Sequence, residues 1–76
     1  MHVRTFADAL AVTPHDTNEN RFGALYVGTT GDVAVEPISN PTSVVFVGVP
    51  AGSYLWINTA KVLSTGTTAD DIVGLR

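Results

Sequence analysis

The stretch ALYVGTTGDVAV, residues 24–35, decides the fold class. β-Branched, aromatic and small apolar residues lie on both sides of a central TTG, which is the pattern of two short strands around a turn. A three-residue loop in which Gly31 takes the left-handed conformation would join them. We therefore predict a β-hairpin with four aliphatic residues on one face: Leu25, Val27, Val33 and Val35.

A second stretch of the same kind is SVVFVGVPAGSYLWINT, residues 43–59. Pro50 suits a turn and Gly52 suits a left-handed position after it, so a second hairpin is expected. Its aliphatic face is expected in the core and carries Val45, Val47, Val49, Leu55 and Ile57. The opposite face is aromatic. It either packs on a second sheet of the same domain or forms a protein interface with Trp56 as its anchor. The predicted interface residues are Phe46, Tyr54, Trp56 and, from the first hairpin, Tyr26.

Turn residues recur about every dozen positions along the rest of the chain, a spacing typical of sandwiches and barrels. The stretch EPISNPT, residues 36–42, is expected to connect two sheets, and AKVLS and DIVGL (60–64 and 71–75) are expected strands. Residues 1–22 differ, because FADALAV suits one helical turn or a short strand and TPHDTNENR suits a loop. The predicted fold is all-β: a small antiparallel β-sandwich or barrel of about six short strands, with a jelly-roll-like arrangement compatible. We expect an extended N-terminal arm over residues 1–22 and a β domain over residues 23–76.

Composition excludes several classes of partner. The chain has 76 residues, a net charge of −3 and four Lys or Arg residues, too few for the basic surface that binds nucleic acid. Its apolar runs are too short for a membrane span or for the core of a signal peptide. Charged residues make up 14% of the chain, against about 25% in typical domains. A small chain without cysteine and with few charges is expected to oligomerise or to dock on a larger body.

No set of residues predicts catalysis or cofactor binding. GTTGD (28–32) lacks the lysine and the following helix of a phosphate loop. His15 and Asp16 are loop neighbours, which do not meet as a catalytic base and its orienting acid must. Asp70 and Asp71 are expected to point to opposite sides of a strand, so together they offer too few oxygens to bind calcium. The only other histidine besides His15 is His2. We expect no catalytic residue, no metal and no cofactor.

Four motifs in order resemble one family. They are AVTPHDT, ALYVGTTGDVAV, VPAG and VLSTGTTADDIVGL, and they span about four fifths of the chain. The set is similar to that of the head-spike base proteins, small capsid-exterior virion proteins of tailed phages and gene transfer agents. EPISNPTSVV and SYLWINTAKV depart from the family pattern, in which a glycine-rich link and a more basic strand are usual.

The resemblance implies a non-enzymatic virion structural protein, made in the host cytoplasm and placed on the outer capsid surface. It would act as a head-spike base or as a cement (decoration) protein. Its implied partners are the major capsid protein, a spike fibre protein and further copies of itself, as a trimer or pentamer. The alternative is a carbohydrate- or ligand-binding β module, since Trp56, Tyr54 and Tyr26 could stack on a sugar.

Overall fold

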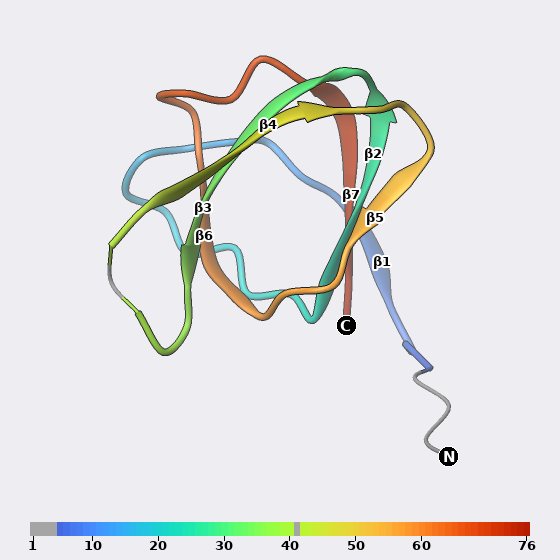
Figure 1. Ribbon diagram of the computed structural model, residues 1–76. Helices are drawn as coiled ribbons and strands as arrows, with labels where there is room; N and C mark the ends of the chain where they lie inside the picture. Colours follow the sequence, from blue (N-terminus) through green and yellow to red (C-terminus); the bar gives the residue numbers. More distant parts are fainter. Residues whose placement is uncertain (1–4, 41) are drawn as a thin grey trace.

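The computed structural model describes residues 5–40 and 42–76, which form seven strands and no helix (Figure 1). Sheet A has the strand order β1-β7-β2-β5, and sheet B has the order β4-β3-β6. The strands of sheet A are β1 (Ala9–Ala11), β7 (Asp70–Leu75), β2 (Ala24–Thr29) and β5 (Ser53–Leu55). Those of sheet B are β4 (Val44–Val49), β3 (Gly31–Pro37) and β6 (Thr59–Leu63). The prediction of a small antiparallel all-β fold is confirmed, with seven strands in place of about six.

The core is aliphatic and is supplied by both sheets. Leu25 and Val27 of β2, Val33 and Val35 of β3, and Val62 of β6 are fully buried. Full burial of one such side chain contributes about 1.5–3 kcal/mol relative to leaving it exposed. The four aliphatic residues of the first stretch therefore belong to the core, as predicted from their alternation.

The pairing predicted for that stretch is wrong. β2 pairs with β5 and β7, whereas β3 pairs with β4 and β6, so the chain changes sheet at Thr30. Backbone bonds from Thr68 and Ala69 to the carbonyl of Asp32 hold the start of β3 away from β2. Gly31 does not take the left-handed conformation. This position requires glycine because the backbone of Ala69 passes close to it: a Cβ at residue 31 would lie 2.5 Å from the Ala69 nitrogen.

The second predicted hairpin is also a change of sheet. Its turn exists, since the Ser53 amide donates to the Pro50 carbonyl at 3.2 Å and Gly52 has φ +84°. The left-handed Gly52 is thus confirmed, but the turn leads from β4 in sheet B to β5 in sheet A. Conversely, the stretch expected to cross between sheets joins β3 to β4 within sheet B.

The faces of β4 differ from the prediction because a bulge interrupts the alternation. Gly48 has φ +65°, and the register with β3 shifts between Gly31 and Val33. The extra residue keeps Val49 in the core and turns Phe46 inward, where it packs against the core cluster. Val45 and Val47, predicted in the core, are 46% and 78% exposed.

The segment before β2 is tied to the sandwich by its backbone. β1 pairs with β7, and the amides of His15 and Asn20 donate to the carbonyls of β6 at Val62 and Ala60. Phe22 is buried, and the hydroxyl of fully buried Thr59 donates to the Asn20 carbonyl. These bonds give the segment partners within its own chain. The expected division into an arm (1–22) and a domain (23–76) stays a prediction.

A carboxylate fastens the loop after β1 to the loop after β6. Asp16 accepts hydrogen bonds from the Thr65 hydroxyl at 2.6 Å, the Thr65 amide at 2.8 Å and the Ser64 hydroxyl at 3.1 Å. The Thr65 bonds, side chain first and backbone second, lower the pKa of Asp16 from its ordinary 3.8 to about 2. Asp16 therefore links two loops that are far apart in sequence, and we call its three hydrogen bonds to Ser64 and Thr65 the Asp16 latch.

We expect Asp16→Asn to make the stability of the protein less dependent on pH between about pH 4 and pH 2. The folded pKa lies below the unfolded value, so the latch stabilises the fold fully above about pH 4 and progressively less as the pH falls toward about 2. The melting temperature of the variant should fall less between these pH values than that of the wild type. Glu19→Gln is the comparison, because the pKa of Glu19 is also lowered, chiefly by its hydrogen bond to Arg21 two residues away, so its change gives the contribution of a mainly local pair. Parallel pH profiles for wild type and Asp16→Asn would contradict the latch.

Candidate protein interface

Four aromatic rings form a continuous row that starts on sheet A with Tyr26 of β2 and Tyr54 of β5 and continues through Trp56 and Phe6 outside the strands; we call this row the aromatic ladder. The centroids of Phe6 and Trp56 are 6.4 Å apart with an interplanar angle of 18°. Trp56 and Tyr54 are 5.2 Å apart at 16°, and Tyr54 meets Tyr26 edge-on at 5.3 Å. Such pairs add about 0.5–1.5 kcal/mol beyond their buried area, so the rings hold one another in place.

Strand alternation puts the ladder on the side of sheet A that faces away from sheet B. Leu25 and Val27 of β2 are buried between the sheets, so Tyr26 between them points outward. Tyr54 is the direct cross-strand partner of Tyr26. Trp56 is 63% exposed and Tyr54 is 48% exposed. The ladder therefore does not lie between the two sheets of the domain, which was the alternative to an interface.

The strands beside the ladder continue the apolar surface. On β7, Val73 is the cross-strand partner of Tyr26, and on β1, Ala11 is the partner of Val73. The next row by the same alternation holds Ala9 and Leu75, and their neighbour Ala24 is fully buried. We call this surface, ladder included, the outer face of sheet A. These two rows carry no charged side chain across four strands.

Three of the four predicted interface residues come together, and one does not. Tyr26, Tyr54 and Trp56 share the ladder, whereas Phe46 lies on β4 and packs toward the core of the domain. Sequence reasoning missed Phe6, which sits outside any strand pattern. The sequence feature that goes with the position of Phe6 is the glycine at residue 23, because a Cβ there would lie 3.0 Å from the Phe6 ring.

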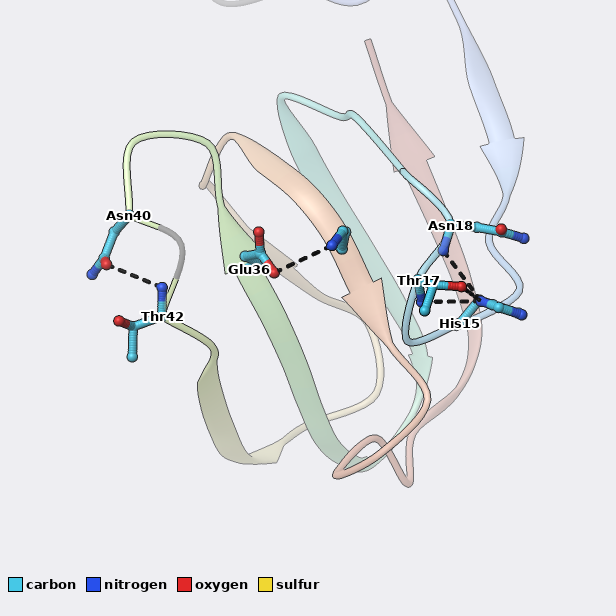
Figure 2. A network of polar contacts seen from close by, with 7 residues as sticks. His15, Thr17, Asn18, Glu36, Asn40 and Thr42 are labelled. Carbon is cyan, nitrogen blue, oxygen red and sulfur yellow. Dashed lines mark hydrogen bonds and ion pairs between the residues drawn. The ribbon is translucent and has the colours of Figure 1, made fainter.

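The polar residues considered for chemistry serve turns instead. The His15 ring nitrogen Nδ1 accepts the backbone amides of Thr17 and Asn18 at 3.1 and 3.2 Å, which closes a turn (Figure 2). Asp16 points to Ser64 and Thr65, so His15 and Asp16 do not form a pair. A Glu36–Lys61 ion pair of 3.7 Å links β3 to β6 (Figure 2).

Asp70 and Asp71, the two acids at the start of β7, have different surroundings because the backbone at Asp71 has a positive φ. Asp71 has φ 55° and accepts the Thr29 hydroxyl at 2.9 Å, and Asp70 lies opposite Thr29 in the strand pair. A Cβ at Gly28 would lie 2.7 Å from the Asp71 backbone, so glycine makes room for this conformation. In residues 5–40 and 42–76, no group of three or more His, Asp or Glu residues could hold a metal, and no pocket is found. His2 lies outside the described residues.

We expect chelation to leave the fold unchanged. Structural metal sites need three or four convergent ligands, and among the described residues no three His, Asp or Glu side chains come together. Thermal melts recorded with and without EDTA should coincide. A melting temperature lowered by several degrees in EDTA would reveal a metal site.

No family model matches the sequence, and no curated protein matches it. Over the part of the chain that the structure describes, no helix is long and apolar enough to cross a membrane. Among solved structures, the chain is similar to a chain of one described as "Capsid of native GTA particle computed with C5 symmetry". The TM-score is 0.83 and the identity is 31%, over 95% of this chain and 84% of that chain. At this identity and coverage, the chain belongs to the capsid-related proteins of phages and gene transfer agents.

Proposed function

We propose that the protein is a non-enzymatic structural component on the outer surface of a phage or gene-transfer-agent capsid. It acts as a head-spike base or a cement protein, is made in the host cytoplasm and binds the major capsid protein. The observation that carries the proposal is the likeness over nearly the whole chain to a protein in the structure of a gene-transfer-agent capsid. His15 closes a turn, Asp16 joins two loops and Asp71 bonds across two strands, and these structural roles agree with a protein that performs no reaction.

The contact with the capsid is made by the outer face of sheet A. An exposed patch with two aromatic rings and no charge is costly to keep in water and is typical of an interaction site. Tyrosine and tryptophan are enriched in protein interfaces, and their rings here are already oriented by mutual packing. Little ordering entropy is then lost when a partner covers them.

A binding assay with capsids that lack this protein tests the proposal. The purified protein should co-sediment with such capsids and saturate at a fixed ratio of copies to capsid protein. A spike base should also retain a fibre protein on the loaded capsid, whereas a cement protein should raise the capsid's resistance to heat without a fibre. Failure to co-sediment at any concentration up to precipitation would refute capsid binding.

A second candidate function rests on the same rings. Tyr54 and Trp56 are 5.2 Å apart with nearly parallel planes, and exposed parallel aromatics can stack on sugar rings. A glycan array separates the two functions. Specific glycan binding that is lost in Trp56→Ala would establish the carbohydrate-binding alternative, and an empty array alongside capsid co-sedimentation would establish the structural role.

A further inference from the structure

The first described residues of the chain, 5–11, lie along the edge of sheet A without entering the core. They include β1, which stands at the end of the sheet beside β7 (Figure 1). Six of these seven residues are exposed, and Phe6 is partly buried. Along the described chain, Val12 is the first residue that packs against the core cluster. A segment with so few buried apolar contacts belongs to the parts of a protein that open most easily.

Much of the attachment of residues 5–11 converges on Arg76. The amides of Ala7 and Asp8 donate to the Arg76 carbonyl at 2.9 and 2.7 Å, and the Arg76 amide donates to the Asp8 carbonyl at 3.0 Å. The Asp8–Arg76 ion pair of 3.5 Å has both side chains about half exposed, and such a pair contributes little to stability. The other attachments are the pairing of β1 with β7 and the stacking of the Phe6 ring on Trp56. None of these contacts fully buries a side chain of residues 5–11.

The attachment changes in kind at Val12. This residue packs against the core cluster, and its amide donates to the Ile72 carbonyl at 2.8 Å. The chain then bonds to the other sheet, because the His15 amide donates to the Val62 carbonyl at 2.9 Å and the Asp16 latch follows directly. An opening that begins at residue 5 therefore meets core packing at residue 12 and a second sheet beyond it, and it stops there.

We propose that residues 5–11 form a strap that opens and closes on sheet A as one unit while the sandwich stays folded. The strap moves as a unit because its first two amide bonds share one acceptor and its strand pairing continues from them. Closed, it supplies Phe6, Ala9 and Ala11 to the outer face of sheet A. Open, it withdraws them and leaves β7, with Val73, as the edge of the sheet. The strap therefore decides whether the outer face is complete.

The strap couples to capsid binding, a step that rests on the proposed function. A capsid surface that covers Phe6, Ala9 and Ala11 fits the closed strap and not the open one. Binding then shifts the strap toward its closed form, because a partner stabilises the form for which it has the higher affinity. By the same linkage, a strap that is open for part of the time lowers the apparent affinity in proportion to the fraction closed. The strap thus regulates the outer face by setting the fraction of molecules that are ready to bind.

Amide hydrogen exchange of the free wild-type protein, measured by NMR at urea concentrations below the unfolding transition, tests the strap. The amides of Ala7 and Asp8 should exchange at least about a hundredfold faster than those of His15 and Val27, each rate being taken relative to an unstructured peptide. Exchange of the strap amides should be nearly independent of urea, since opening the strap exposes little surface. The exchange rate of Val27 should rise with urea, because its amide is released by unfolding of the sandwich.

Substitutions separate strap opening from unfolding of the sandwich. Val35→Ala removes buried volume from the core, so exchange at Val27 should become at least about tenfold faster while exchange of the strap amides stays unchanged. Phe6→Ala removes the stacking on Trp56 and should make exchange of the strap amides up to about tenfold faster. The matched control is Arg21→Ala, which breaks an exposed ion pair outside the strap and should leave the strap amides unchanged.

Three results in the free protein would each overturn the strap: strap amides that exchange as slowly as Val27, that follow Val27 in urea or in Val35→Ala, or that exchange as in an unstructured peptide. For the coupling, residues 5–11 should exchange at least about tenfold more slowly in protein bound to capsids than in free protein. A protein that binds capsids with unchanged exchange in the strap would overturn the coupling. A protein that never binds would refute the proposed function and not the strap, which the rates in the free protein decide.

Discussion

The substitution Gly74→Ala should destabilise the protein by about 3 kcal/mol, although the same change in an open strand position is usually stabilising. Gly74 is buried in β7, which lies between β1 and β2 in sheet A. A Cβ at this position would lie 2.4–2.5 Å from three atoms of the Phe22 ring. Phe22 is 6% exposed and belongs to the core cluster, so its ring has nowhere to move without opening the core.

The expected loss is a large share of the total, because a domain of 76 residues has a free energy of unfolding of roughly 4–11 kcal/mol. Urea denaturation measures it directly. The control is the double variant Gly74→Ala/Phe22→Leu, in which the smaller side chain leaves room for the methyl group. Its cost should be well below the sum of the two single costs. If the losses in free energy of unfolding of the two single variants simply add in the double variant, or if Gly74→Ala is as stable as the wild type, then the Phe22 ring does not restrict the side chain at residue 74.

Local patterns in the sequence predict the strands well, because each strand is specified by its own alternation and turn residues. Leu25, Val27, Val33 and Val35 are buried as their spacing predicts. Which strands pair is not a local property. A turn such as Pro50–Ser53 has the same residues whether it closes a hairpin or carries the chain to the other sheet. The start of β3 is bonded at Asp32 to Thr68 and Ala69 of a distant loop, a contact that no local pattern announces.

The candidate interface was predictable in part for the same reason. Tyr54 and Trp56 are two residues apart in one segment, so a single period-2 pattern puts them on one face. A hairpin with unbroken alternation would put Phe46 on that face, but the bulge at Gly48 breaks the alternation and the turn at Pro50 leads to the other sheet. Phe6 joins the ladder through a contact across the fold beside Gly23, which has no local signature.

The substitution with the largest expected effect on function is Trp56→Ala, which we expect to weaken capsid binding about 30-fold. Trp56 is 63% exposed and lies between Phe6 and Tyr54 in the ladder. Tryptophans at the centre of an interface are often worth roughly 2 kcal/mol or more, which corresponds to that factor in affinity. Within the free protein the same ring contributes only its stacking with two neighbours, about 0.5–1.5 kcal/mol each at most. The loss of capsid affinity should therefore exceed the loss of folding stability.

Two further variants make this comparison sharp. Trp56→Phe keeps a ring between Phe6 and Tyr54 and should retain most of the capsid affinity. Val47→Lys alters the exposed β4 edge, away from the ladder, and should bind capsids as the wild type does if the outer face of sheet A is the contact. A Trp56→Ala protein that unfolds would assign the ring to the stability of the domain. A folded Trp56→Ala protein that saturates capsids at wild-type concentrations would exclude the ladder from the interface, because removing the most exposed ring from a real contact must leave a gap that the partner cannot fill.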